Sequence, residues 1–446
     1  MLGFKFLGNT RVPHYKDTEN MPAVRIKPSE EVLILMSQHI GAPAKPVVKV
    51  GDEVLVGQLI AEAVGNVSAP IYSSVSGKVV AIEEHITHMG TNDEAIRIKS
   101  DGLMTLCDGI EPPTVNNIDE FCEAIRKSGV VGLGGAGFPT AVKASALKSG
   151  NIDTVLINGS ECEPYLTCDA RTMIDDAMWV VKGVQLISEL APSVKSFVIG
   201  IEDNKPECIE KMTEVFADKD YVNVVKLPTK YPQGAEKVLI HNTLKRVVPE
   251  GKLPADIGVL VFNVSTVAFI AKYIETGMPL VEKAMTVSGN AVNEPKNVIA
   301  PIGMSARDVL EAAGGVKEDL GKVVFGGPMT GYAISTLDEP VIKTTGGIIA
   351  FTKKESKEPK NTSCIHCGRC LAACPHKLNL VKYSDALKLN DIEEKMHMLE
   401  ENKILLCMEC GCCSYVCPAR RPLIQNNRLA KAEYKKYKAH QATLKK

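Results

Sequence analysis

The chain has 446 residues, of which 45% are hydrophobic and 24% charged, with one Trp and a net charge of −1. A chain of this length is too long to fold around one hydrophobic core, so several domains are expected. Because the net charge is near zero, the protein has no overall positive potential to attract nucleic acid, and we do not expect nucleic acid as a partner. The opening residues, MLGFKFLGNTRVPHYK, lack the long apolar segment of a secretion signal.

The best candidate for a membrane span is IGVLVFNVSTVAFIA, residues 257–271. These 15 residues are too few to cross a bilayer, and Lys272 and Glu275 follow directly. We therefore predict a buried strand running into a helix, and no transmembrane segment. The protein is expected in the cytoplasm or peripherally on a cytoplasmic membrane face.

Residues 1–110 form the first predicted domain, a small β-domain. Its short Val-rich strands surround Gly51-Asp52 and Gly57-Gln58, which are typical hairpin turns. The pattern VKVGDEVLVGQ…APIYSSVSGKV resembles the lipoyl-type barrel-sandwich hybrid. That family attaches its cofactor to a lysine at the hairpin tip, and Lys78 does not match that motif. A structural or docking role is therefore predicted.

Residues 111–280 alternate between predicted helices and strands, which indicates a layered α/β domain. The predicted helices are IDEFCEAIRKSG, Met173 to Leu190, and KPECIEKMTEVFA; the strands are TVLINGSECEP, SFVIGIE and GVLVFNV. Residues 281–352 then suggest a compact β-grasp unit with a strand pair, a helix and KVVFGGPMTG. The charged stretch TKKESKEPKNTS, residues 352–363, marks a boundary.

A glycine-rich loop, GVVGLGGAGFPTAVKAS, lies near the start of the α/β domain. Glycines let the backbone approach a ligand, and N–H groups at a helix start favour phosphate. A plain tight turn is the alternative. A dinucleotide fingerprint would place an acid about 20 residues further on; Asp153 is near that distance, but Phe138-Pro139 is atypical.

Eight of the 14 cysteines form two runs with the same spacing, Cys-x2-Cys-x2-Cys-x3-Cys-Pro. This is the bacterial ferredoxin pattern, in which the fourth Cys of each run ligates the other cluster. Two zinc ribbons are the alternative, but zinc usually takes two CxxC pairs per site. We predict two 4Fe–4S clusters in residues 353–430, the first held by Cys364, Cys367, Cys370 and Cys417, the second by Cys407, Cys410, Cys413 and Cys374.

The remaining cysteines and the C-terminal segment are predicted to have structural rather than catalytic roles. Buried structural thiols are expected for Cys107, Cys122, Cys162, Cys168, Cys208 and Cys412. The basic tail, residues 431–446, is predicted to be a solvated helix or frayed end, with docking on a larger assembly as the alternative.

Four motifs taken together resemble a known flavoprotein. GLGGAGFPTAVK, NGSECEP, YPQGAEK and FNVST are similar to segments of the FMN-bearing, NADH-oxidising subunit of respiratory complex I. With the barrel, the β-grasp (SLBB) unit and the two-cluster module, residues 20–425 resemble the C-subunit family of Rnf complexes, membrane-bound ferredoxin:NAD oxidoreductases. The resemblance implies a multidomain α/β protein with a mainly helical ferredoxin-type module.

The resemblance also implies cofactors, partners and site residues. FMN, NAD(H) as substrate and two 4Fe–4S clusters are expected in a peripheral electron-transfer subunit of an ion-translocating complex. Its partners would be the other Rnf subunits, membrane-embedded and ferredoxin-interacting, with ferredoxin reached indirectly. The implied residues are Gly132, Gly134, Gly135 and Lys143 on the flavin phosphate side, Asn158, Glu161 (catalytic) and Glu163 near the isoalloxazine and nicotinamide, Tyr231, Gly234 and Glu236 on the other wall, Asn263 and Thr266 at the phosphate or ribityl chain, and Phe138 stacking on NADH.

Two other functions stay open. The chain departs from the complex I pattern at Ser160, where an acid is usual, and at Phe262 and Ser265, which replace Asn and Glu. One alternative is the NAD-linked flavin and iron–sulfur module of a soluble hydrogenase or reductase. The other is a non-catalytic iron–sulfur docking scaffold.

Overall fold

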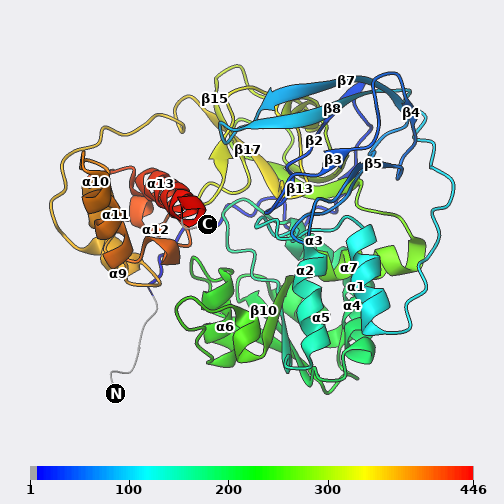
Figure 1. Ribbon diagram of the computed structural model, residues 1–446, viewed down its shortest axis with the longest axis horizontal. Helices are drawn as coiled ribbons and strands as arrows, with labels where there is room; N and C mark the ends of the chain where they lie inside the picture. The colour runs from blue at the N-terminus through cyan, green and yellow to red at the C-terminus, as the bar shows by residue number, and fades with distance from the viewer. Residues whose placement is uncertain (1–7, 445–446) are drawn as a thin grey trace.

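The computed structural model describes residues 8–444, which fold into a barrel, an α/β unit, a mixed-sheet unit and a helical module (Figure 1). The helical module, orange to red, stands to one side of the other units. Residues 1–7, which begin the predicted N-terminal domain, lie outside the described residues. So do Lys445 and Lys446 of the predicted basic tail.

The barrel is built from two small sheets with strand orders β2-β8-β7-β4 and β3-β5-β6. Ile34, Ile96 and Val79 point into its core and are fully buried. This architecture agrees with the predicted barrel-sandwich hybrid. Its strands are β2 (Glu31–Leu35), β3 (Lys45–Pro46), β4 (Glu53–Val54), β5 (Leu59–Glu62), β6 (Ile71–Tyr72), β7 (Gly77–Ile86) and β8 (Asn92–Ser100).

The chain before the barrel, residues 8–25, takes a different course, and we call it the N-terminal strap. Gly8 lies so close to Cys374 that an added Cβ would be 2.2 Å from the Cys374 carbonyl oxygen. Thr10 exchanges two backbone hydrogen bonds with Tyr231, of 2.8 and 2.9 Å. Strand β1 (Val24–Arg25) then pairs with β14 of the mixed sheet. The strap therefore contacts the helical module, the α/β unit and the mixed sheet in turn.

The α/β unit has a parallel sheet of order β11-β10-β9-β12. Side chains alternate between its faces: Phe197 and Ile157 join the larger core, and Leu156 and Val261 join a smaller core under α6. Its elements are α1 (Ile118–Lys127), α2 (Thr140–Ala144), β9 (Thr154–Asn158), α3 (Cys168–Asp175), α4 (Ala177–Leu190), β10 (Ser196–Glu202), α5 (Pro206–Val215), β11 (Val222–Leu227), α6 (Glu236–Leu244), β12 (Val259–Asn263) and α7 (Val264–Thr276).

In chain order this sheet runs third, second, first, fourth, so the strand order reverses between β9 and β12. Ligands of open α/β sheets bind beyond the carboxyl ends of the strands at such a switch point. The apolar stretch 257–271 forms β12 and the first part of α7, as predicted from its composition. The helix predicted from Met173 to Leu190 is wrong in one respect, because the chain breaks at Asp176 between α3 and α4.

The mixed sheet, of order β1-β14-β13-β17-β15-β16, contains the predicted β-grasp unit. Its elements after β1 are β13 (Glu282–Ser288), β14 (Lys296–Pro301), α8 (Ala306–Ala312), β15 (Leu320–Phe325), β16 (Tyr332–Ala333) and β17 (Gly347–Thr352). Met285, Val298 and Ile348 pack into one core with the inward-facing barrel residues. The barrel and this sheet therefore support each other.

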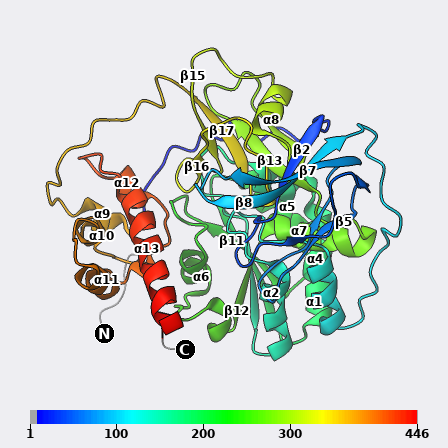
Figure 2. The same ribbon diagram turned by 45° about the horizontal axis from the view of Figure 1, so that its top comes forward.

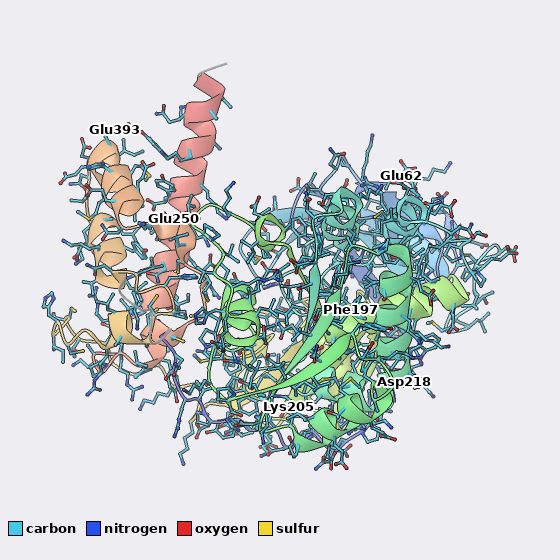
Figure 3. All side chains as sticks on the ribbon, turned by 90° about the horizontal axis from the view of Figure 1, so that it is seen from below. Glu62, Phe197, Lys205, Asp218, Glu250 and Glu393 are labelled. Carbon is cyan, nitrogen blue, oxygen red and sulfur yellow. The ribbon has the colours of Figure 1, made fainter. Side chains whose placement is uncertain are left out.

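The helical module holds both cysteine runs. It consists of α9 (Arg369–Ala373), α10 (Leu380–Ala386), α11 (Ile392–Glu401), α12 (Cys412–Tyr415) and α13 (Leu423–Leu444). The predicted basic tail continues α13, which Figure 2 shows as a long red helix across the module. Figure 3 places Glu393 on α11, far from Phe197 in the parallel sheet. Glu250 reaches the module through an ion pair of 2.5 Å with Lys403. Within residues 8–444, no helix is both long and apolar enough to cross a membrane.

Lys343 joins three of the units from a fully buried position. Its Nζ donates to the carbonyl oxygens of Pro70 and Gly129, both at 2.7 Å, and its backbone N–H donates to Gln38 Oε1 at 3.0 Å. Burial lowers the pKa of Lys343 from 10.5 to about 7. At a pH between these two pKa values, Lys343 is protonated in the unfolded chain and deprotonated in the folded chain.

We therefore expect the unfolding free energy to rise with pH in this window, by up to about 1.4 kcal/mol per pH unit from Lys343. Lys343→Met should remove this contribution, so the variant's unfolding free energy should depend less on pH than that of the wild type. Urea unfolding at several pH values between about 7.5 and 9.5 measures the difference. Lys353→Met, at an exposed lysine near the end of β17, is the control; equal slopes in wild type and Lys343→Met would contradict the expectation.

Candidate flavin and iron–sulfur sites

The carboxyl edge of the parallel sheet carries two of the predicted residues side by side. Asn158 ends β9 and Asn263 ends β12, and the two are partners in the parallel register. Asn263 caps α7, because its Oδ1 accepts from the N–H groups of Ser265 at 3.0 Å and Thr266 at 3.3 Å. Asn158 Nδ2 donates to the Gly234 carbonyl at 2.9 Å. Both residues therefore lie at the switch point.

The glycine loop reaches the same edge. Leu133 N–H donates to Thr266 Oγ1 at 3.0 Å, and Gly134 lies against the Asn263 side chain. The loop closes through a 2.9 Å bond from the Gly132 N–H to the Phe138 carbonyl. In the described part of the chain, the N–H groups of Gly134, Gly135 and Ala136 have no acceptor, and all three residues are exposed. Consecutive free N–H groups beside a helix N-terminus fit the phosphate of a flavin.

Gly134 gives a direct test of this close approach. An added Cβ would lie 2.9 Å from Asn263 Nδ2, closer than packed atoms allow. Gly134→Ala should displace the Asn263 cap and raise the Kd for FMN by about tenfold or more, since overpacking costs about 1–3 kcal/mol. Fluorescence titration with FMN measures the Kd.

The matched control is Gly346→Ala, where the added Cβ would meet Leu166 at an ordinary 3.7 Å. The control should bind FMN as the wild type does. Wild-type affinity in Gly134→Ala would contradict the placement of the loop against the flavin.

Lys143 and Glu236, predicted for opposite sides of the flavin, form an ion pair of 3.1 Å. Lys143 Nζ also donates to the Val261 carbonyl of β12 at 2.9 Å. Both side chains are partly exposed, so the pair keeps access to a ligand. Asp153 does not fit the dinucleotide interpretation: it precedes β9, at the opposite end from Asn158, and pairs with Arg246 at 2.8 Å.

The segment after β9 contains both predicted acids. Glu161, with a left-handed φ of 44°, accepts from the N–H groups of Asp169 at 2.7 Å and Ala170 at 3.1 Å, and so caps α3. Glu163 accepts from the backbone N–H groups of Met329 at 3.0 Å and Thr330 at 2.9 Å. Burial raises the pKa of Glu163, and these hydrogen bonds oppose that rise.

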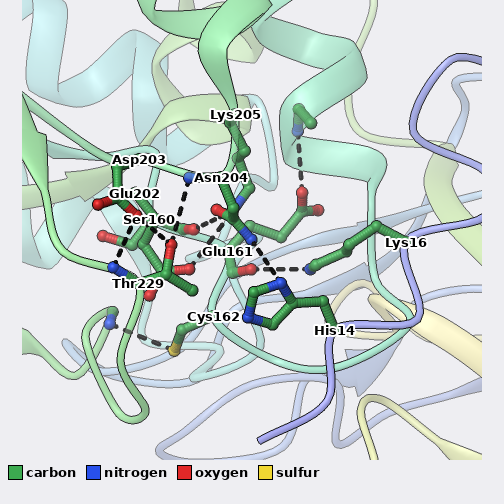
Figure 4. Close-up of polar contacts among 12 residues, drawn as sticks. His14, Lys16, Ser160, Glu161, Cys162, Glu202, Asp203, Asn204, Lys205 and Thr229 are labelled. Carbon is green, nitrogen blue, oxygen red and sulfur yellow. Dashed lines mark hydrogen bonds and ion pairs between the residues drawn. The ribbon is translucent and has the colours of Figure 1, made fainter. Parts of the chain in front are cut away.

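Two lysines beside this segment were not predicted: Lys16, which is partly buried, and Lys205, which is buried (Figure 4). Lys16, from the N-terminal strap, donates to the carbonyl oxygens of Glu161 at 2.9 Å and Glu163 at 2.8 Å, and also to that of Leu166. Lys205 donates to the Ser160 carbonyl at 2.7 Å and lies 3.5 Å from Glu202. Neither lysine belongs to a motif, so only the fold reveals their positions.

Asp169 is a third unpredicted residue of the site. Its carboxylate accepts from Asn263 Nδ2 at 2.7 Å and from Ser265 Oγ at 2.6 Å. Burial, followed by repulsion from Glu161, raises the pKa of Asp169 to about 6. The sequence marks Asp169 only as an acid in the first turn of a helix, α3. Such acids commonly stabilise the helix N-terminus, so this pattern alone does not indicate a binding site.

Tyr231 and Gly234 lie where the α/β unit meets the helical module. Gly234 N–H donates to Cys162 Sγ at 3.3 Å, and Tyr231 OH donates to Glu163 at 3.3 Å. On its other side, Tyr231 accepts at its carbonyl from Cys412 Sγ at 3.8 Å. One apolar cluster, which we call the seam, joins these elements: Val12, Tyr231, Ala373 and Cys412, with Cys162, Met329, Cys410 and Val416 around them.

The cysteines gather into two sets that cross between the runs. A single cavity is lined by Cys374 of the first run together with Cys407, Cys410 and Cys413 of the second, and also by Cys412. Burial raises the pKa of Cys370, and the nearby Cys417 and Cys364 raise it further. Cys367, the fourth predicted ligand of that set, is exposed. Sets of four thiols are the donors that 4Fe–4S clusters require, so the residues present fit two clusters.

Comparison with known proteins supports this combination. The RnfC barrel sandwich hybrid domain matches residues 4–103, the Nuo51 FMN-binding domain 125–272, the SLBB domain 285–333 and a 4Fe-4S dicluster domain 363–420. The chain is thus a flavin and iron–sulfur protein, with FMN and two 4Fe–4S clusters as cofactors. The predicted fold class and cofactors are confirmed.

Two curated relatives define the family. The C subunit of the proton-translocating ferredoxin:NAD(+) oxidoreductase complex of Clostridium ljungdahlii is 47% identical over 371 residues, 82% of this chain and 80% of that protein. The C subunit of the Na(+)-translocating complex of Acetobacterium woodii is 43% identical over 388 residues, 85% of this chain and 87% of that protein. The chain therefore belongs to the family of C subunits of ion-translocating ferredoxin:NAD(+) oxidoreductase complexes, as the motifs predicted.

A more distant likeness concerns the fold alone. A chain of the NAD+-reducing [NiFe]-hydrogenase in its air-oxidized state aligns with a TM-score of 0.50 and 18% sequence identity. The alignment covers 71% of this chain and 63% of that one.

Proposed function

We propose that the chain is the peripheral electron-transfer subunit of an Rnf-type complex on the cytoplasmic face of the cell membrane. It would exchange electrons between NAD(H) and, through other subunits, ferredoxin. The seam supports this proposal most directly, because it joins the candidate flavin wall at Tyr231 and Cys162 to the cysteine module at Cys410 and Cys412. A buried apolar junction of this kind would favour electron transfer between the two sites.

FMN, when bound, accepts a hydride and passes its electrons on singly, which connects NAD(H) with one-electron carriers. The chain's own groups orient the reactants. The free N–H groups of Gly134 and Gly135, with the α7 N-terminus at Asn263, would bind the flavin phosphate. Phe138 would stack on NAD(H), and Lys143 would hold a phosphate while paired with Glu236.

Glu161 and Glu163 would position the isoalloxazine and nicotinamide rings, as the family resemblance implies. Each carboxylate is fixed by two backbone N–H groups, so each would approach the rings with little freedom to move. Asn158, on the same side as the two acids, would be tied to Gly234 of the opposite wall, because its Nδ2 donates to the Gly234 carbonyl.

The seam also favours an order for the two clusters. Cys374, Cys407 and Cys413 are buried, whereas Cys364 and Cys370 are partly exposed and Cys367 is exposed. The second cluster would therefore lie next to the flavin, and the first would face partner subunits. The ion that such a complex moves would be handled by those partners.

Anaerobic cofactor analysis of the purified chain tests the function. We expect one FMN and about eight iron atoms per chain, and bleaching of the flavin absorbance by NADH. A chain with full iron but no NADH-bleachable flavin would favour the docking scaffold and contradict the proposal.

Association with membranes separates the proposal from a soluble reductase. The chain should sediment with membranes that hold the other subunits and be released by high salt, as expected for a peripheral subunit. Full activity with no membrane association, in cells that make the whole complex, would favour the soluble alternative.

A further inference from the structure

Asn427 is a buried amide on the otherwise apolar inner face of α13. It is fully buried, and its neighbours on that face include Leu423, Ile424 and Ala430, which are also buried. Its Nδ2 lies 3.7 Å from Cys407 Sγ and 3.9 Å from Cys413 Sγ, within hydrogen-bonding range of both. The side chain therefore points at two predicted ligands of the second cluster.

The amide occupies this position at a cost. Its Oδ1 has no hydrogen-bond partner among residues 8–444. A buried, unsatisfied acceptor destabilises the folded state, and Asn is a poor helix former. Leucine would fill similar space without either penalty. The sulfur atoms here stand for the thiolates that bind iron, and thiolates accept hydrogen bonds, so the N–H donors are what the amide contributes.

The first cluster has no such side chain. In the described part of the chain, its predicted ligands receive a backbone N–H, from His366 to Cys364 Sγ at 3.4 Å, and no side-chain donor. Both clusters have backbone donors, since the Leu378 N–H lies 3.5 Å from Cys374 Sγ. Asn427 therefore gives the second cluster a side-chain hydrogen-bond donor that the first cluster lacks among the described residues.

We propose that the Asn427 carboxamide donates hydrogen bonds to the Cys407 and Cys413 thiolates and thereby raises the reduction potential of the second cluster above what burial alone would give. A reduced cluster carries one more negative charge, and N–H donors to its sulfurs stabilise that charge. Asn427 is a positioning residue, acting on the cluster through its ligands. The proposal rests on the cluster ligation proposed above.

The role predicts that the cluster beside the flavin holds an electron more readily. Lys431, one turn further along α13, donates to the Cys407 carbonyl at 2.7 Å but is paired with Glu409 at 2.9 Å. That ion pair adds little net charge near the cluster. The amide is therefore the side-chain group whose removal should change the potential most.

Anaerobic redox titration of Asn427→Leu, followed by electron paramagnetic resonance, tests the role. At the wild-type midpoint of the second cluster, the variant's reduced-to-oxidised ratio should be about tenfold lower, a shift of about 59 mV for a one-electron carrier. The first cluster should titrate as in the wild type. Asn426→Leu is the matched control, because Asn426 Nδ2 donates to Ser384 Oγ at 2.9 Å, away from the sulfurs.

An unmoved midpoint in Asn427→Leu with full iron content would overturn the role of Asn427 and leave the ligation proposal intact. A wild-type chain with one cluster would overturn both. If Asn427→Leu loses its second cluster, the test is made on the wild-type protein instead. Wild-type protein labelled with ¹⁵N only in asparagine side chains should show a ¹⁵N coupling to the reduced second cluster in pulsed electron paramagnetic resonance spectra. Absence of that coupling would overturn the proposal.

Discussion

Cys374→Ser should remove the second cluster and leave the first in place, although Cys374 belongs to the first cysteine run. Its side chain lines the cavity shared with Cys407, Cys410 and Cys413. Because α9 ends at Ala373, the chain turns there and carries Cys374 away from its own run. Serine replaces a soft thiolate by a poorer iron ligand, so iron should fall from about eight to about four atoms per chain.

Iron analysis and electron paramagnetic resonance of the reduced protein check this result. Cys417→Ser should do the reverse and remove the first cluster. Cys412→Ser is the matched control: Cys412 lines the same cavity but lies outside the ligand spacing, its Sγ donates to the Tyr231 carbonyl, and both clusters should remain. If Cys374→Ser kept the second cluster and lost the first, the crossed assignment would be wrong.

Lys16→Met should abolish tight FMN binding while both clusters remain. The Lys16 ammonium holds three carbonyl oxygens of the segment that carries Glu161 and Glu163. Hydrogen bonds to a charged group contribute about 1.5–3 kcal/mol each, and their loss leaves three partly buried carbonyl oxygens without this donor. The FMN Kd should therefore rise by about a hundredfold or more.

Flavin titration of the iron-loaded protein measures this effect. Arg11→Met, at an exposed position of the same strap, should bind FMN as the wild type does. A folded Lys16→Met protein with unchanged flavin affinity would show that the strap does not support the pocket. Melting curves of both variants separate local loss of flavin from general unfolding.

Local patterns predicted much of this molecule. Strand β10 matches SFVIGIE residue for residue, and α1 and α5 lie within the stretches predicted to be helical. Cysteine spacing indicated the cofactor type, because iron–sulfur ligation imposes a local spacing. The family resemblance assigned Asn158 and Asn263 to the same site, and the two residues end neighbouring parallel strands.

Contacts between distant segments were not predictable in the same way. Lys16 lies 145 residues from Glu161 in the chain, and no local pattern marks it as a ligand of that backbone. Glu163 illustrates the same limit: its N–H donors come from Met329 and Thr330, in the loop between β15 and β16. Such pairs depend on how whole units pack, which composition and periodicity do not encode.

The N-terminal strap has a consequence for biosynthesis. Residues 8–18 leave the ribosome before Tyr231 and Cys374, which they contact and which are made hundreds of residues later. At about 5–20 residues per second, tens of seconds pass before these contacts can form. The strap can therefore complete its contacts only after residue 374 has been translated, so docking of the helical module against the strap is a late step in folding.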